Sequence, residues 1–156
     1  MGLRKILTVD EAALHKTCKP VTDFDAKLHK LLDDMRDTLL DSGGVGLAAP
    51  QVGIVRRVVL VDTGEEILEL VNPTLVETSG EQIGAEGCLS VPNKYGLVKR
   101  PYYAKVRAQD RFGNWYEAEG EELTARCFCH ELDHLDGIIY TELMERYLTE
   151  EELLLD

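Results

Sequence analysis

The sequence of 156 residues lacks the features that would place it in a membrane or in an export pathway. No apolar run approaches the ~18–20 residues that a membrane-spanning helix needs. The N-terminus has no apolar stretch of the ~7–15 residues that a secretory signal requires. We therefore expect a cytoplasmic protein that has no membrane partner.

Internal repeats, low-complexity tracts and linkers rich in serine or proline are also missing. The composition, 44% hydrophobic and 29% charged residues, is that of a globular protein with a core rather than of a disordered chain. A chain of this length is typical of one domain. We expect a single domain over residues 1–156.

Basic clusters are scarce, and no run of Lys and Arg is longer than two residues. The chain has 29 acidic and 17 basic residues, which gives a formal net charge of −12. Phosphate backbones and anionic lipids would repel such a protein. We therefore expect no direct nucleic-acid binding.

Cysteines are few and unevenly spaced, which disfavours a disulfide framework in a chain of this length. Their thiols are expected to be free, catalytic or bound to a metal. The four are Cys18, Cys88, Cys127 and Cys129. The histidines that could share a metal site with them are His15, His29, His130 and His134.

Apolar periodicity predicts two main helices. Residues 25–41 carry one apolar stripe, with Thr22 or Asp23 as the N-cap and Ser42-Gly43-Gly44 at the end. Residues 123–135 form the second helix, which Gly137 closes. A short acidic turn follows from Thr149, where Glu152 is placed for a capping box.

Between the helices the sequence predicts strands, and the whole pattern is that of an α+β fold. A turn at residues 110–114, with glycine at a suitable place, joins the last two strands. The acidic stretch near residues 117–122 is expected to be a solvated face. The predicted strands cover residues 57–62, 67–73, 103–109 and 115–119.

The strongest functional signal is the sequence HELDH at residues 130–134. On a helix, residues four apart differ by about 40° in azimuth and about 6 Å in height, so His130 and His134 can reach one metal ion. Glu131 lies beside that face, where it can contact a water molecule on the metal. This pattern is typical of two metal ligands and a general base.

The third protein ligand of such a site, which usually leaves one position open for water, has two possible sources. One source is Cys88, in the sequence EGCLSVP at residues 86–92, where a sulfur at a strand edge can project into a cleft. The other is a carboxylate downstream of the helix. The downstream candidates are Glu142, Glu145, Glu150, Glu151 and Glu152.

A third segment, GVGLAAPQVG at residues 44–53, crowds small residues into an expected loop. Small residues permit close approach by a peptide or by another chain. A phosphate-binding loop is not expected, because no Lys-Ser/Thr pair follows the glycines. Gln51, near the end of this segment, has a side-chain amide that can donate to an oxyanion.

Together, these segments resemble peptide deformylase of the compact bacterial type. The family's signatures occur in order, as GVGLAAPQ at 44–51, EGCLS at 86–90 and HELDH at 130–134, and the resemblance covers nearly the whole chain. It implies antiparallel β-sheets packed around a central helix that carries the HExxH motif. It also implies removal of the formyl group from N-formylmethionyl nascent polypeptides, with release of formate.

The resemblance assigns roles to the metal site. Cys88, His130 and His134 would hold one metal ion, and metal-bound water would attack the formyl carbon. Glu131 would act first as general base and then as general acid. The Gln51 amide and the backbone N–H of Leu89 would stabilise the oxyanion together with the metal.

The same resemblance implies that peptide backbone lies along Val45, Gly46 and Gly87 as an added strand. Glu86 and Arg100 would pair beside the site in a structural role. Cys127 could line the methionine pocket or pack in the core. Cys18 and Cys129 are expected to be inert thiols, and His15 and His29 to be surface residues.

Ligand softness alone favours zinc for a thiolate and two imidazoles. The resemblance instead implies Fe²⁺ as the native ion, with Zn²⁺ or Ni²⁺ after aerobic handling. It also implies a transient contact with the ribosome. The short acidic C-terminus, residues 150–156, lacks the basic helix that some relatives use for docking.

Two other functions remain open on the residues. A zinc endopeptidase would use a downstream carboxylate as third ligand, but it leaves GVGLAAPQ and EGCLS unexplained. A metal-binding module without activity would leave Glu131 without a role.

Overall fold

The two main helices are α1, Ala26–Ser42, and α2, Leu123–Leu135, in a computed structural model that describes residues 2–154. Helix α2 has the predicted bounds. The predicted N-cap of α1 is wrong: Asp25, rather than Thr22 or Asp23, accepts a hydrogen bond from the Leu28 N–H. Asp25 directly precedes the first turn, where its side chain reaches an N–H with no partner in the helix.

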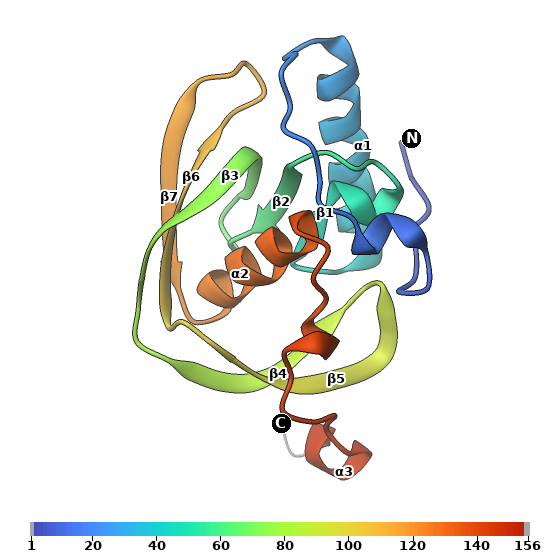
Figure 1. The fold of residues 1–156 in the computed structure, drawn as a ribbon, viewed down its shortest axis with the longest axis vertical. Helices are drawn as coiled ribbons and strands as arrows, with labels where there is room; N and C mark the ends of the chain where they lie inside the picture. The colour runs from blue at the N-terminus through green and yellow to red at the C-terminus, as the bar shows by residue number, and fades with distance from the viewer. Residues whose placement is uncertain (1, 155–156) are drawn as a thin grey trace.

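The strands form two antiparallel sheets, as predicted for an α+β fold (Figure 1). The larger sheet has the order β1-β2-β3-β6-β7, and the smaller is a hairpin of β4 and β5. The bounds are Gly46–Ala48 for β1, Val58–Asp62 for β2, Ile67–Ser79 for β3, Gln82–Cys88 for β4, Val91–Arg100 for β5, Tyr103–Gln109 for β6 and Trp115–Glu121 for β7.

Strand β2 shows why the large sheet is covered on both faces. Val58 and Leu60 pack in a cluster with the apolar stripe of α1, whereas Val59 and Val61 pack in a cluster with α2. Successive side chains of a strand point to opposite faces, so a strand buried on both faces is apolar without alternation. Helix α2 therefore lies inside the molecule, against the sheet (Figure 1), and its motif residues are buried.

The predicted end of the strand that begins at residue 67 and the predicted loop at residues 44–53 were both wrong. Strand β3 does not end at Pro73 but continues to Ser79, because the pairing with β6 shifts register between Val71 and Thr74. That irregularity accommodates a residue without an N–H. The expected loop at residues 44–53 contains β1 and a short 3₁₀ turn, Ala49–Val52, because pairing with β2 overrides the weak strand preference of small residues.

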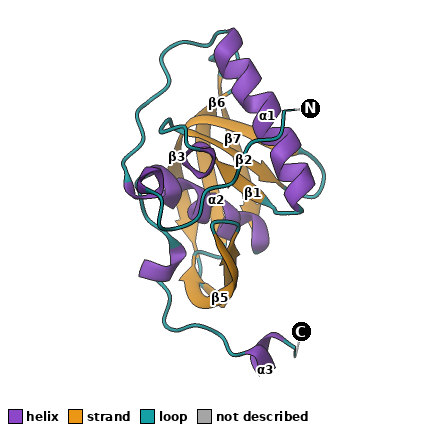
Figure 2. Cartoon of the chain, turned by 90° about the vertical axis from the view of Figure 1, so that its right-hand side faces the viewer, coloured by secondary structure: helices purple, strands orange, loops and turns teal. Residues whose placement is uncertain are grey.

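The β4–β5 hairpin lies below α2 in Figure 1, and the C-terminal segment pairs with strand β5. Leu97 of β5 donates its N–H to the Arg146 carbonyl, and its own carbonyl accepts from Glu145. Beyond this pairing, the predicted capping box of Thr149 and Glu152 begins helix α3, Glu150–Leu153, at the far end of the molecule (Figure 2). Residues 155 and 156 of the acidic C-terminus lie outside the described residues.

Several surface predictions can be compared with the fold. Glu117, Glu119 and Glu121 are exposed on β7, as expected of a solvated face. His15 is exposed, but His29 is only half-exposed, because its Nε2 lies 2.8 Å from the Arg111 carbonyl. Among the described residues, no helix is long and apolar enough to cross a membrane.

Candidate active site

Helix α2 carries the HELDH motif into the interior. His130 and His134 lie one turn apart with ring centroids separated by 4.9 Å, and His134 is fully buried. Burial lowers the pKa of His134 well below its usual range. A neutral imidazole is the form that binds a metal.

Cys88, the last residue of β4, brings its sulfur to the two histidines. Its Sγ lies 3.3 Å from His134 Nε2, and one ligand atom from each of the three residues lies within 4.8 Å of the others. Among the described residues, this is the one group of three His, Cys, Asp or Glu side chains placed to hold a metal ion. A thiolate and two imidazoles suit Zn²⁺ or Fe²⁺.

The downstream carboxylates are engaged elsewhere or point away. Glu142 accepts from the Ile139 N–H, and Glu152 pairs with Arg146. Glu145, Glu150 and Glu151 are exposed. The geometry therefore gathers Cys88, not a carboxylate, beside the two histidines.

Glu131 is buried beside the candidate metal ligands with one oxygen free. Its Oε1 has no hydrogen-bond partner among the described residues, and burial raises the pKa of its carboxyl group to about 7. Gly46 approaches so closely that a Cβ there would lie 2.6 Å from Glu131 Oε2 and 2.6 Å from Cys127 Sγ. A buried carboxylate oxygen without a hydrogen-bond partner is suited to bind a small polar ligand such as water.

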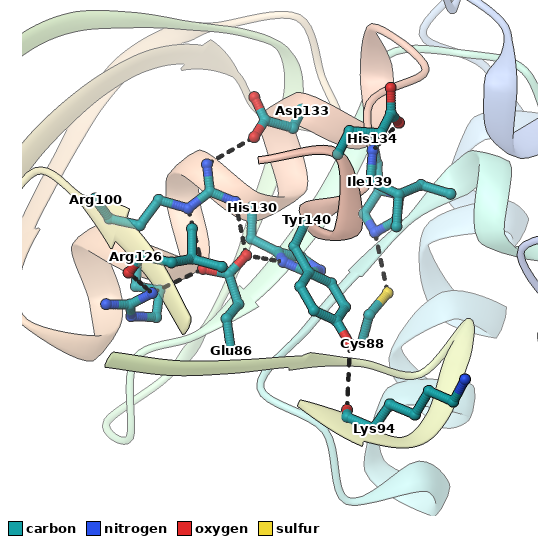
Figure 3. A network of polar contacts seen from close by, with 12 residues as sticks. Glu86, Cys88, Lys94, Arg100, Arg126, His130, Asp133, His134, Ile139 and Tyr140 are labelled. Atoms are coloured by element: carbon teal, nitrogen blue, oxygen red, sulfur yellow. Dashed lines mark hydrogen bonds and ion pairs between the residues drawn. The ribbon is translucent and has the colours of Figure 1, made fainter. Parts of the chain in front are cut away.

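A network of charged groups surrounds the outer side of His130 (Figure 3). Its Nδ1 lies 2.6 Å from Oε2 of Glu86 on β4. Arg100 donates to both Glu86 oxygens, and Arg126 donates to Oε1 over 2.9 Å. Burial opposes ionisation of Glu86, but the hydrogen bonds from His130 and Arg100 outweigh it and lower its pKa to about 2. The predicted Glu86–Arg100 pair is present, at 2.6 Å.

Gln51, in the 3₁₀ turn after β1, is held with its amide group toward the sulfur. Its Oε1 accepts from the Ala48 N–H, and its Nε2 donates to Ser90 Oγ over 3.1 Å and lies 3.6 Å from Cys88 Sγ. The side chain is 1% exposed. Because the oxygen is fixed by Ala48, the NH₂ group points toward Cys88 and Ser90.

A cavity of about 550 Å³ opens over these groups, and the residues expected to bind peptide line it. Gly46 lies on β1, the edge strand of the large sheet, and Gly87 lies on β4 across the cavity. A Cβ on Gly87 would lie 2.6 Å from the ring of Tyr95. Val45 is 43% exposed at the rim. Two free strand edges that face one cavity can accept an extended peptide between them.

Cys127 of α2 belongs to a core cluster and also lines the cavity, and its predicted place in a methionine pocket stays a prediction. Burial raises the pKa values of Cys18 and Cys129, which keeps both as protonated thiols. Sequence reasoning missed Arg126 and Ser90. The signal for Arg126 was a charged residue one turn before His130 on a buried helix.

The fold and the site together define a class of protein. A buried HExxH helix, with a thiol brought beside it by a hairpin and a cavity above, is the arrangement of a metal-dependent hydrolase.

Comparison with known proteins narrows this class. The family model for polypeptide deformylase matches residues 3–149. A peptide deformylase of Caldicellulosiruptor bescii is 51% identical over 153 residues, which cover 98% of this chain and 92% of the relative. The chain belongs to the polypeptide deformylase family.

Solved structures agree with this assignment. A peptide deformylase from Legionella pneumophila matches with a TM-score of 0.88 at 41% identity. The match covers 98% of this chain and 90% of the Legionella chain. One from Thermotoga maritima has a TM-score of 0.89 at 37% identity, with coverages of 92% and 98%. The protein is thus a metal-dependent hydrolase that removes the N-formyl group from nascent polypeptides.

Proposed function

We propose that Cys88, His130 and His134 hold one divalent metal ion and that Glu131 is the general base and acid of deformylation. The observation that carries this proposal is the convergence of the three ligand atoms within 4.8 Å, beside a buried Glu131 oxygen without a partner among the described residues. When bound, the ion supplies Lewis acidity and lowers the pKa of water toward neutrality.

Glu131 moves the protons of the reaction. Its free Oε1 accepts a proton from the water molecule that attacks the formyl carbon. The same carboxyl group then donates that proton to the leaving amine, which frees the N-terminus of the peptide and releases formate. Such a base typically contributes about 10²–10⁴-fold to the rate.

Gln51 and Leu89 stabilise the negative charge that develops on the formyl oxygen. The Gln51 side-chain amide is held at its oxygen by the Ala48 N–H and at its NH₂ group by Ser90 Oγ, so it needs no rearrangement to donate. The Leu89 N–H follows Cys88 directly in the chain. Loss of one such donor typically costs about 3–4 kcal/mol of transition-state stabilisation.

The substrate binds as an extended strand between Gly46 and Gly87, with Val45 at the rim. Both glycines lie on strand edges that line the cavity, and a larger side chain at Gly46 would enter the space between Glu131 and Cys127. Backbone hydrogen bonds then hold the peptide independently of its sequence.

The native ion that we propose is Fe²⁺, with Zn²⁺ or Ni²⁺ replacing it after handling in air. The soft thiolate and two imidazoles accept all three ions, so the ligands alone do not select one. Metal analysis of protein purified without oxygen should find iron, and aerobic preparations should gain zinc or nickel. Zinc in the oxygen-free protein would contradict this assignment.

The chain acts as one catalytic domain in the cytoplasm, where nascent peptides emerge, and it meets the ribosome only transiently. With a net charge of −12 and an acidic α3, electrostatic attraction to ribosomal RNA does not assist this encounter.

The experiment that tests the proposal uses protein purified without oxygen, with its metal counted. It is mixed with the peptide formyl-Met-Ala-Ser, and mass spectrometry follows the products. Glu131→Gln should retain metal but lose at least about 10²-fold in kcat. Glu145→Gln, a change of the same kind at an exposed position, should match the wild type.

The other functions give different products. Cleavage of internal peptide bonds with the formyl group intact would indicate an endopeptidase. Retention of metal by Cys88→Ala would exclude Cys88 as a ligand. Full activity of Glu131→Gln would contradict the role of Glu131.

A further inference from the structure

The candidate metal ligands come from two parts of the fold that no backbone hydrogen bonding joins into one sheet. Cys88 ends β4 in the two-stranded hairpin, whereas the histidines lie on α2, which packs against the five-stranded sheet. A metal site tolerates errors of only about 0.2 Å in its ligand distances. Some set of side chains must therefore fix the hairpin relative to the helix.

Glu86, two residues before Cys88, is the centre of that set. Each of its oxygens accepts two hydrogen bonds: Oε1 from Arg100 Nε and Arg126 Nη1, and Oε2 from Arg100 Nη2 and His130 Nδ1. The distances are 2.6–3.0 Å, and Glu86 is 4% exposed. Every in-plane acceptor direction of the carboxylate is therefore filled by a donor.

This arrangement determines which nitrogen of His130 carries hydrogen. Two guanidinium groups, which stay charged in proteins, donate to Glu86, so the carboxylate is an acceptor toward all its neighbours. His130 Nδ1 must then be the donor. Its Nε2 is then the nitrogen that keeps a lone pair for a metal ion.

Arg126 closes the network from the helix side. It precedes His130 by one turn of α2, it is 7% exposed, and the Nη1 that meets Glu86 also lies 3.1 Å from the Val98 carbonyl of β5. One guanidinium of α2 thus contacts both strands of the hairpin. At the other end, Asp133 of α2 accepts from Arg100 of β5 over 2.7 Å.

The charges of the network balance. Two buried or half-buried carboxylates, Glu86 and Asp133, face two buried guanidinium groups, Arg100 and Arg126. Removing one partner of such a set leaves an uncompensated buried charge, which the remaining groups must move to accommodate. In this network, movement of Glu86 displaces the imidazole of His130.

We propose that Arg126 is a positioning residue of the metal centre: through Glu86 it fixes the orientation of His130 and the placement of the hairpin-borne Cys88 relative to α2. Asp133 supports the same arrangement through Arg100. This inference rests on the proposed ligand set of Cys88, His130 and His134.

The test uses Co²⁺ as the probe metal, because a thiolate ligand gives a charge-transfer absorption band. Affinity is measured by competition with a chelator, and the band is recorded at saturation. Arg126→Met keeps much of the side-chain volume but removes the charge and the donors. We expect it to bind Co²⁺ about 10–100-fold more weakly, with an altered band, because loss of an outer hydrogen-bond partner typically has this effect.

Two further variants separate positioning from general stability. Arg126→Lys, which keeps the cation, should recover part of the affinity. Arg111→Met is the matched control, because Arg111 also donates hydrogen bonds to a glutamate, Glu69, but does not line the cavity. Its affinity and band should equal those of the wild type.

If Arg126→Met does not fold, Asp133→Asn, at the more exposed end of the network, should weaken Co²⁺ binding in the same direction. Wild-type affinity and an unchanged band in a folded Arg126→Met would overturn the inference about Arg126 but would leave the proposed ligand set standing. Equal losses in Arg126→Met and Arg111→Met would also overturn it. A wild type without a thiolate band, or a band that survives in Cys88→Ser, would refute the ligand set itself.

Discussion

Gly46 shows how a missing side chain shapes the site at the scale of single residues. It is buried on β1, and the space that its Cβ would occupy lies between the Cys127 sulfur and a Glu131 oxygen. The conformational freedom of glycine is not what the position uses, since its φ is not positive. The position requires only a backbone that can come close to the proposed base.

We predict that Gly46→Ala lowers kcat/KM by about 100-fold while the metal content stays unchanged. The added methyl group displaces Glu131, and an error of about 1 Å in the position of a catalytic group can cost this much. Deformylation kinetics and metal analysis on the same preparation measure both quantities.

Gly84→Ala is the matched control, because the nearest atom to its Cβ is Arg126 Nη2 at 3.5 Å, an ordinary contact. It should remain within about threefold of the wild type, well below the 10²-fold effect of misplacement. Equal rates for Gly46→Ala and the wild type would show that the close approach at β1 has no catalytic consequence.

At the scale of elements, the end of α2 is held against the N-terminal segment. Gly137 has a φ of +76°, and a Cβ there would lie 2.8 Å from the carbonyl group of His15. Nearby, the Cys18 N–H donates to the Leu135 carbonyl. The left-handed residue therefore both terminates the helix and permits the N-terminal segment to pass beside it.

Gly137→Ala should lower the free energy of unfolding by about 2–4 kcal/mol, of which about 1–2 kcal/mol is the cost of a left-handed alanine. The clash with the backbone of His15 supplies the rest. Urea denaturation of the metal-loaded protein measures the change.

The control for this substitution is Gly64→Ala, which has a φ of +95° but nothing within 4 Å of its Cβ. It should cost only the conformational part, about 1–2 kcal/mol. Losses of the same size in both variants would mean that the contact with the N-terminal segment does not constrain the helix end.

Elements differ in how well the sequence predicts them, for a local reason. Helix α2 and strand β2 can each be predicted from residues that are close together in the sequence. The bounds of α2 match the prediction. Strand β1 does not, because Gly46 and Ala48 have weak strand preference and pair only because β2 lies beside them. Pro73 likewise predicts the end of a strand when the local sequence is considered alone. In the fold, the register shift between β3 and β6 lets the strand continue past it.

At the scale of the whole molecule, the proposed metal would link the hairpin to the helix that the large sheet supports. A ligand that binds only the folded state stabilises it by about 2.7 kcal/mol when present at 100 times its Kd. Nearly all of the ligand geometry is lost on unfolding, because Cys88 and His134 are 46 residues apart in the chain.

Removal of the metal by a chelator should therefore lower Tm by roughly 5–10 °C, since about 2–4 °C corresponds to 1 kcal/mol in a chain of this size. Differential scanning calorimetry of the loaded and stripped protein measures this shift. Cys88→Ser should show a much smaller difference between the two states. A shift that persists undiminished in Cys88→Ser would mean that the metal is held elsewhere.

The sequence by itself determined the features that depend on neighbours along the chain. The spacing of His130, Glu131 and His134 is readable because a helix repeats every 3.6 residues, and the small residues around Gly46 are adjacent in the sequence itself. The motif spacing predicted a metal site, the order of helices and strands predicted an α+β fold, and the resemblance of the three segments to a family implied a hydrolase. The spacing left the third ligand open between Cys88 and five carboxylates.

Only the tertiary structure decided which distant groups meet. It brought Cys88 to the histidines, engaged Glu142 and Glu152 elsewhere, and placed Arg126 and Asp133 around Glu86 and Arg100. No local pattern encodes such meetings, because they depend on how the hairpin packs against α2. The buried charges of Glu86, Arg100 and Arg126 are compatible with that packing because each of these three groups has a partner of opposite sign.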